Sequence, residues 1–247
     1  MPIEFLSDAM RRIVSSQQDA EELGSGFGGP HGPAEGPVWW KEGGYLLFSD
    51  IHASRRMKWE PGRGISIDKE GTANANGQTR DRQGRLVACH HFSRCVDRLE
   101  ADGSVTVIAD RYRGLKLNRP NDVVVKSDGS IYFSDPPPRP PLTPPEHTPE
   151  LDLGSERMFC DMRGDDRPGV PDGMKVDVEG NVYCTGPGGI WVLSPDGEHI
   201  GTIGHRAVNL NWGDDDWQTL YFTGPTTLHR IRLNIPGIPV PRGSLEL

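Results

Sequence analysis

Short runs of β-branched and aromatic residues alternate along this chain with turn signals such as Asp-Gly and Pro-Gly. In 118–135, a polar start leads into Val123–Val125, a turn over 127–130 and a second apolar run, Ile131–Phe133. Two such runs around an Asp-Gly turn predict a β-hairpin. The outline recurs, and the second strands of the five copies end at Asp50, His90, Asp135, Gly186 and Gly224.

The copies are spaced about 40 to 50 residues apart, which is the length of a four-stranded propeller blade. Further strand candidates joined by tight turns lie between them, for example in 57–67, 96–108 and 190–200, so each unit holds about two hairpins. The sequence therefore predicts an all-β fold, a single β-propeller domain over 1–247 with four-stranded blades and five visible repeats. A β-sandwich or barrel is the alternative, but neither predicts a fixed period.

Three segments lie outside the repeats. Near the start of the chain a short helical face is predicted, formed by Ile3, Leu6, Met10 and Ile13. Residues 11–28 could complete the last blade. The proline-rich segment 136–154 cannot join a central sheet and is predicted as a surface loop, which either overhangs the site or only connects two units. Residues 240–247 resemble an expression-vector tail and are left out of the fold prediction.

The composition limits the partners of the protein. A net charge of −8 and a pI near 5.5, without any run of Lys and Arg, argue against a nucleic-acid partner. No apolar run is long enough to span a bilayer and the start lacks a signal pattern, so we expect no membrane partner and a cytoplasmic location. The cysteines show no CxxC spacing, which argues against a structural zinc site, and free thiols agree with a reducing compartment.

Polar residues stand at the start of each predicted inner strand. In a propeller these strands line the central channel, so residues that begin them on the same side converge near the axis. They are Glu35, Asn76, Asn121 with Asp122, Asp172 and Asn209. Carboxylates and amides supply only oxygen ligands, which suit a hard divalent cation. A single Asn or Asp before a strand more often bonds its own backbone in a turn, but its repetition at equivalent positions favours a functional ring.

The motifs at these strand starts carry a family resemblance. Glu35-Gly36-Pro37-Val38-Trp39 begins the first repeat, Asn76-Gly77 the second, Arg119-Pro120-Asn121-Asp122 the third and Pro171-Asp172-Gly173 the fourth. In these motifs the chain resembles the SMP-30/gluconolactonase/luciferin-regenerating-like family. The resemblance implies a normally six-bladed propeller with a divalent metal on its axis and lactone or ester hydrolase activity.

The resemblance also implies roles for individual residues. Glu35, Asn121 and Asp172 would be metal ligands, for Ca²⁺ first and for Zn²⁺, Mg²⁺ or Mn²⁺ as alternatives. Asn121 would also orient water or substrate, and Asp172 could move a proton, so these two are the catalytic candidates. Arg119, Asn76 and His90 are the candidates for substrate binding. Because adjacent strand residues point to opposite faces, His90 and His91 cannot share one metal; His90 could face the channel, with a structural or surface role as the alternative.

One departure from the family affects the functional prediction. Members carry a further blade between the third and fourth repeats, whose first residues supply another metal-ligating Asn, whereas here 149–154 leads directly into 155–159. The family resemblance predicts a metal-dependent hydrolase of sugar lactones such as gluconolactone. The missing blade and its ligand give the alternative, a catalytically impaired propeller that acts as a binding scaffold. A ring that stays open would also leave unpaired strand edges through which oligomers could form.

Overall fold

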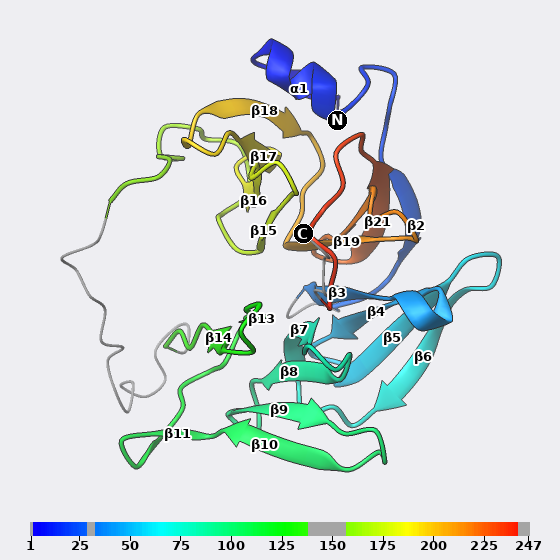
Figure 1. Ribbon diagram of the computed structural model, residues 1–247, viewed down its shortest axis with the longest axis vertical. Coiled ribbons are helices and arrows are strands. Elements are labelled where there is room, and N and C mark those ends of the chain that lie inside the picture. Colours follow the sequence, from blue (N-terminus) through cyan, green and yellow to red (C-terminus); the bar gives the residue numbers. More distant parts are fainter. Residues whose placement is uncertain (1, 29–32, 138–156, 242–247) are drawn as a thin grey trace.

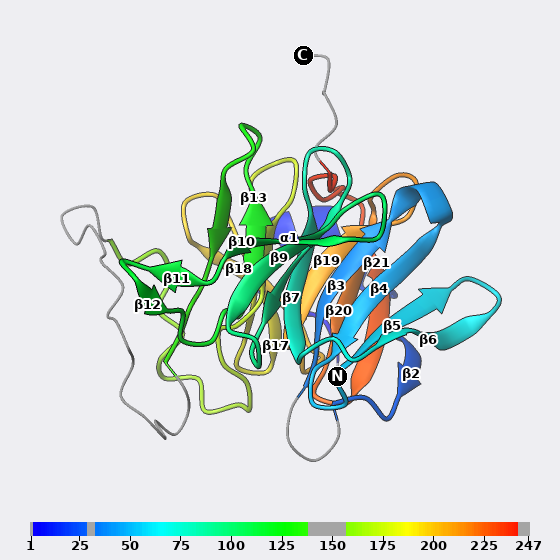
Figure 2. The ribbon, with the colours of Figure 1, turned by 90° about the horizontal axis from the view of Figure 1, so that it is seen from below.

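The computed structural model describes residues 2–28, 33–137 and 157–241. Its strands form separate antiparallel sheets around a common centre, as predicted for an all-β propeller (Figure 1). In every sheet except the small β11–β12 ladder, one edge strand faces this centre. Neighbouring inner strands contact one another in the order β13, β7, β3, β19 and β15, and Figure 2 shows β7, β3 and β19 side by side.

The first two sheets follow chain order and correspond to whole predicted blades. The first contains β3 (Ala34–Trp40), β4 (Tyr45–Asp50), β5 (Arg55–Glu60) and β6 (Gly64–Glu70), with the 3-10 turn η2 (Lys41–Gly43) between β3 and β4. The second contains β7 (Ala75–Arg80), β8 (Leu86–His90), β9 (Cys95–Leu99) and β10 (Val105–Ala109).

The last two sheets each gain a strand from the start of the chain. The strands β15 (Met174–Val176), β16 (Val182–Gly186), β17 (Gly189–Leu193) and β18 (His199–Ile203) are joined by β1 (Glu4–Phe5). The strands β19 (Asn209–Gly213), β20 (Thr219–Thr223) and β21 (Thr227–Arg232) are joined by β2 (Glu21–Ser25). The N-terminal segment thus completes the last blade, as expected for 11–28. The helix α1 (Asp8–Ile13) lies between β1 and β2 and buries Met10 and Ile13, whereas Leu6 is half-exposed.

The third unit is smaller than predicted. Its described part is the hairpin of β13 (Val123–Val125) and β14 (Ile131–Phe133), preceded by the small ladder of β11 (Arg111–Tyr112) and β12 (Leu115–Lys116). Five units are therefore present, but this one is not four-stranded within the described residues. The predictions for 138–154 and for 242–247 lie outside the described ranges.

Glycines let the inner strands approach closely enough to bring the polar residues together. Gly36 has a φ of +51°, and a Cβ there would lie 2.5 Å from the carbonyl oxygen of Asn76. A Cβ on Gly77 would lie 2.3 Å from Oδ1 of Asp122. Real Cβ atoms do not approach other atoms this closely, so a side chain at either position would push neighbouring units apart. The glycines that follow Glu35 and Asn76 therefore have a packing role.

Aromatic side chains fill the space between neighbouring sheets. Tyr183 of the fourth unit meets Trp212 of the fifth edge-to-face, with 4.7 Å between ring centroids, and Trp39 of the first unit stacks on Tyr221 of the fifth at 5.5 Å. Such pairs contribute about 0.5–1.5 kcal/mol each beyond the area they bury. The fifth unit is thus held on both sides, which fixes the position of β19 beside β3 and β15.

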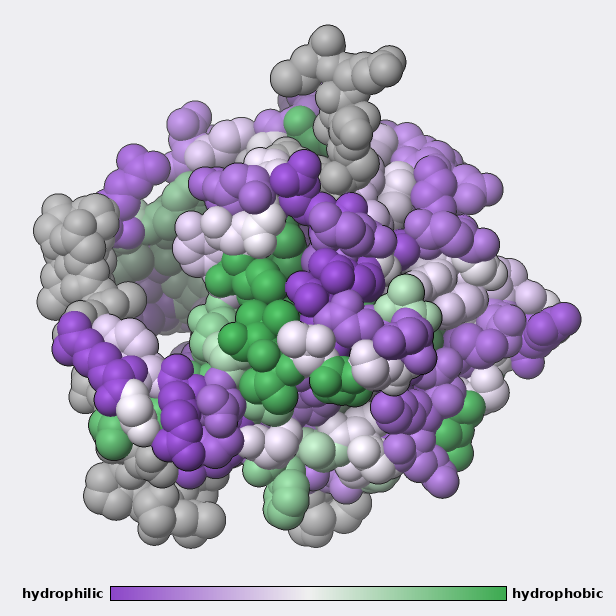
Figure 3. Space-filling model, turned by 60° about the horizontal axis from the view of Figure 1, so that its bottom comes forward, coloured by the Kyte–Doolittle hydropathy of each residue, from purple (hydrophilic) through white to green (hydrophobic). Residues whose placement is uncertain are grey.

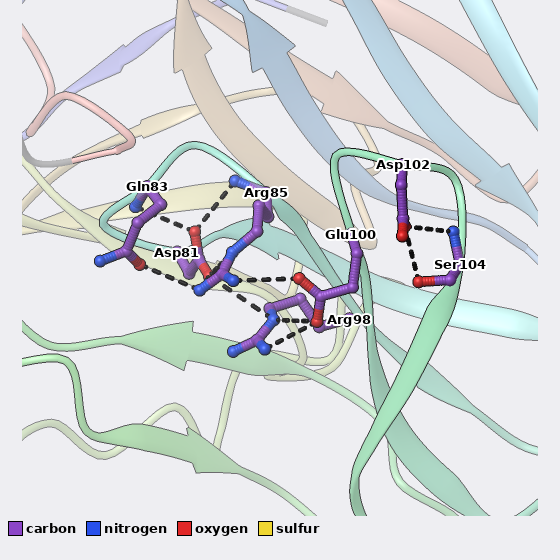
Figure 4. Close-up of polar contacts among 7 residues, drawn as sticks. All are labelled: Asp81, Gln83, Arg85, Arg98, Glu100, Asp102 and Ser104. Carbon is purple, nitrogen blue, oxygen red and sulfur yellow. Dashed lines mark hydrogen bonds and ion pairs between the residues drawn. The ribbon is translucent and has the colours of Figure 1, made fainter.

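Aspartates hold the turns that follow several inner strands. Asp81 accepts hydrogen bonds from the backbone N–H groups of Gln83 and Arg85 at 3.0 and 2.9 Å, and the Arg85 side chain continues the network to Glu100 at 3.0 Å (Figure 4). In the fourth unit, buried Asp177 accepts from two backbone N–H groups of its own turn at 2.9 Å. These turns align the inner strand with its neighbour in each hairpin.

Apolar side chains of the third and fourth units are exposed, and Val124, Met174 and Val176 line one cavity of about 330 Å³. On the β13–β14 hairpin, Val124 and Tyr132 are 46% and 57% exposed; on β15, Met174 and Val176 are 55% and 36% exposed. Val123, the neighbour of Val124 on β13, points to the other face and is buried against the second sheet. Figure 3 shows one face of the molecule, on which hydrophobic side chains gather in one area among largely hydrophilic ones.

Candidate active site

A cavity of about 510 Å³ lies where the inner strands begin. Glu35 reaches it from β3, Asn76 from β7, Asn121 from the segment before β13, and Asp172 from the segment before β15. Arg119 also lines the cavity. The structure therefore brings together the three predicted metal ligands and two of the three predicted substrate-binding residues.

Glu35 is a buried carboxylate, only 2% exposed. Its Oε2 accepts hydrogen bonds from the amide of Asn209 at 2.8 Å and from the backbone N–H of Gly36 at 3.0 Å. Burial, together with the nearby carboxylates of Asp172 and Asp122, raises the pKa of Glu35 to about 8. Three carboxylates close together in a poorly solvated place favour either a bound proton or a bound cation.

Asp122 and Lys175 form a second polar group near the centre. The Asn209 amide nitrogen lies 3.3 Å from Oδ2 of Asp122, and the Lys175 ammonium lies 3.7 Å from the same oxygen. Asp122 precedes β13 and Lys175 belongs to β15, so this contact joins the third unit to the fourth. Lys175 had no predicted role, and Asn209 was predicted only as a polar strand start.

Backbone hydrogen bonds hold the predicted catalytic residues in place. The Asn121 carbonyl accepts from the N–H of Gly77 at 2.8 Å, and the Asp172 N–H donates to the hydroxyl of Thr185 at 2.9 Å. The carboxylate of Asp135 accepts from the N–H of Arg119 at 2.6 Å, which fixes the turn before β13. The position of each side chain at the cavity therefore depends on its neighbouring strand as well as on its own segment.

His91, rather than His90, belongs to this cavity. Its Nε2 lies 2.8 Å from the Asn76 amide and its Nδ1 lies 3.2 Å from Nη2 of Arg119. Burial, together with the positive charge of Arg119, lowers the pKa of His91 to about 4, so the ring is neutral near pH 7.

His90 lines a separate cavity of about 200 Å³ between the first and second sheets, where its Nδ1 faces the carbonyl of Thr72 at 2.8 Å and its Nε2 faces Asp97 at 2.9 Å. This corrects the prediction that His90 faces the channel. The two histidines do point to opposite faces, as predicted. Cys89 packs against Val123 of the third unit. Because side chains two residues apart along a strand lie on the same face, His91 also points towards the third unit, where Arg119 lies.

The family model for the SMP-30/gluconolactonase/LRE-like region matches residues 33–139 and 147–226. The chain belongs to this family. A gluconolactonase from Zymomonas mobilis is 26% identical, with 81% of this chain and 78% of the relative aligned. That alignment runs over 278 residues, more than the 247 of this chain, so the relative carries residues without a counterpart here.

Solved structures of family members agree with this placement. A structure described as a putative gluconolactonase has a TM-score of 0.81 and 25% identity, covering 96% of this chain and 99% of the other. A gluconolactonase from Xanthomonas campestris has a TM-score of 0.78 and 26% identity, covering 94% and 95%. A luciferin-regenerating enzyme, at 15% identity and a TM-score of 0.67, shares the fold. Membership of the SMP-30/gluconolactonase/LRE-like family supports a lactonase-like function and a small-molecule substrate.

The donor set of this family member fits a hard cation. Two carboxylates and an amide, from Glu35, Asp172 and Asn121, line one cavity, and among the described residues Oε1 of Glu35 receives no hydrogen bond. In the described ranges no three His, Cys, Asp or Glu side chains cluster tightly enough to hold a metal by themselves. An amide or carbonyl oxygen would therefore complete any site.

Within the described ranges, no helix has the length and hydrophobicity needed to cross a membrane.

Proposed function

We propose that the protein is a metal-dependent hydrolase of sugar lactones of the gluconolactone type. The observation that carries this proposal is the convergence of Glu35, Asn121 and Asp172 in one cavity with cationic Arg119, in a chain whose relatives include gluconolactonases. The cavity is lined by few large apolar side chains and many polar ones, which suits a polyhydroxylated ligand better than a lipid-like one.

Glu35, Asn121 and Asp172 would hold the metal through oxygen atoms. We propose calcium first, since every candidate ligand is a hard oxygen donor, with magnesium, manganese or zinc as alternatives. When bound, such an ion supplies positive charge that polarises the lactone carbonyl and offsets the negative charge on the tetrahedral oxygen. The same charge would stabilise the ionised form of buried Glu35.

The residues of the chain would carry the remaining steps. Hydrolysis adds the oxygen of water to the carbonyl carbon, breaks the ring C–O bond and transfers a proton to the departing ring oxygen. Asp172 would accept the proton of the attacking water on the carboxylate oxygen that does not hold the metal, and return it to the departing ring oxygen. Asn121 would orient the water or the lactone. Arg119 and Asn76 would donate hydrogen bonds to oxygen atoms of the substrate.

A pH-stat assay tests the proposal. The purified protein is expected to open glucono-lactone faster than the spontaneous reaction, to lose this activity with EDTA and to regain it with Ca²⁺. Asp172→Ala is expected to abolish activity, whereas Asp161→Ala, at an exposed residue paired with Arg163, is expected to leave it unchanged. If EDTA leaves the rate of hydrolysis unchanged, a role of the metal in catalysis is excluded. If the rate equals that of the spontaneous reaction, lactonase activity is excluded.

The reduced third unit favours a second candidate function, a propeller scaffold that binds a ligand without catalysis. The exposed faces around Val124 and Met174 are the observation behind it. A ligand that binds only the folded state raises the melting temperature, so thermal-shift titrations with Ca²⁺ and with gluconate separate the candidates. A shift with the sugar acid but without lactone turnover would support the scaffold; turnover would contradict it.

A further inference from the structure

His91 contacts both residues proposed to bind the substrate, Arg119 and Asn76. Its ring lies between them in the axial cavity, with Nδ1 3.2 Å from Nη2 of Arg119 and Nε2 2.8 Å from the amide of Asn76. Neither ring nitrogen is therefore left to act as a base towards a substrate. The hydrogen-bonding capacities of the three side chains determine how they are arranged.

Only one form of the His91 ring is compatible with Arg119. A guanidinium group can donate hydrogen bonds but cannot accept them. The doubly protonated ring and the Nδ1–H form would both place a hydrogen against the Arg119 donor. The neutral form with its hydrogen on Nε2 leaves a lone pair on Nδ1, which accepts from Arg119. The contact with Arg119 therefore assigns the hydrogen of His91 to Nε2.

This assignment determines which atom of Asn76 faces His91. Because Nε2 then carries a hydrogen, its partner has to be an acceptor, and the only acceptor on the Asn76 side chain is Oδ1. With the amide nitrogen towards His91, Oδ1 is buried without a hydrogen-bond partner among the described residues. A half-turn of the planar amide exchanges oxygen and nitrogen: Oδ1 gains His91 as its donor, and the N–H₂ group moves to the position that has no partner among the described residues.

We propose that His91 is a positioning residue that accepts a hydrogen bond from Arg119 and donates one to Oδ1 of Asn76, so that Asn76 offers its N–H₂ group to an oxygen of the lactone. This inference rests on the proposed function. Asn76, 2% exposed, is then a hydrogen-bond donor to the substrate and not a metal ligand. In the competing arrangement Oδ1 faces the metal and the Asn76 N–H₂ group donates to Nε2 of His91. The ring hydrogen is then on Nδ1, where it excludes a hydrogen bond from Arg119.

The form of the ring can be observed directly in the wild-type protein. Long-range ¹H–¹⁵N correlation spectra distinguish protonated from unprotonated histidine nitrogens, and the His91 signals are identified by their loss in His91→Asn. We expect a hydrogen on Nε2 and none on Nδ1 at pH 7. A hydrogen on Nδ1 would overturn the proposal. This measurement needs neither turnover nor metal, so it decides the role of His91 even if the lactonase assay is negative.

Two substitutions separate the two hydrogen bonds. The Asn side chain can place an acceptor where Nδ1 lies, and the Gln side chain can place a donor where Nε2 lies. His91→Asn should therefore keep the bond to Arg119, and His91→Gln the bond to Asn76. We expect each to lower kcat/KM about tenfold, the effect of roughly 1.4 kcal/mol, and His91→Ala to lower it further. His205→Asn, at a histidine that pairs with exposed Asp19, is the matched control and should leave kcat/KM unchanged.

Calcium affinity distinguishes a donor from a ligand at Asn76. In a thermal-shift titration with Ca²⁺, Asn76→Ala and the His91 variants should keep the wild-type midpoint within about twofold, while kcat/KM falls in all of them. A tenfold loss of calcium affinity in Asn76→Ala would overturn the proposal by making Asn76 a ligand. Equal kcat/KM in wild type and all His91 variants would overturn it as well.

Discussion

Replacing Glu35 by Gln should stabilise the metal-free protein although it destroys the proposed metal site. An unfolded glutamate has a pKa near 4.5, and burial beside Asp172 and Asp122 raises the pKa of Glu35 to about 8 in the folded state. Because the folded-state pKa is raised, the contribution of Glu35 to the free energy of unfolding is largest below about pH 4.5, where the side chain is protonated in both states. This contribution is lost as the pH rises towards 8. Since each pH unit in this window changes the free energy of unfolding by about 1.4 kcal/mol, the loss by pH 7 is about 3 kcal/mol.

Urea unfolding in EDTA between pH 5 and pH 8 measures this effect. The stability of the wild type relative to Glu35→Gln should fall by about 2.5 kcal/mol from pH 5 to pH 7, which leaves Glu35→Gln more stable by about 3 kcal/mol at pH 7. The comparison with Glu35→Gln is needed because the lowered pKa of His91 adds the opposite pH dependence to both proteins. With saturating Ca²⁺ the order should reverse, because only the wild type gains stability by binding the ion. The reasoning is refuted if Glu35→Gln is less stable than the wild type in EDTA at every pH.

Three further predictions concern packing and association. Gly36→Ala should destabilise the protein by about 2 kcal/mol more than Gly44→Ala in urea unfolding, because both glycines have positive φ but only at Gly36 would a Cβ meet another strand. Asp177→Ala should cost about 3 kcal/mol, since it leaves buried hydrogen-bond donors unpaired, whereas Asp128→Ala in the matching exposed turn should cost less than about 1 kcal/mol. If the wild type associates through its exposed apolar faces, Val124→Lys should make it monomeric in size-exclusion chromatography; a dimer that survives the substitution would place the interface elsewhere.

The repeat pattern predicted the candidate site better than it predicted the individual blades. Glu35, Asn121 and Asp172 converge because each stands at the same point of a repeated unit, and this relation depends only on local sequence. The choice between His90 and His91 depended on which face of β8 packs against the third unit, which is a property of the assembled ring. The contact between Asp122 and Lys175 joins units that are distant in sequence, so no local pattern could indicate it.

The site can persist without a further blade because its contacts run along the part of the ring that is present. From β13 through β7, β3 and β19 to β15, each inner strand contacts the next. Glu35 lies on β3 at the middle of this series, so packed strands connect it to Asn121 on one side and to Asp172 on the other. At the two ends of the series, the ammonium of Lys175 lies 3.7 Å from the carboxylate of Asp122, and Asn209 connects that carboxylate to Glu35. The Lys175–Asp122 ion pair is partly solvated and its charged atoms are 3.7 Å apart, so it adds little stability. Strong attraction between its two ends is not needed to assemble the site, because the packed sheets already place them together.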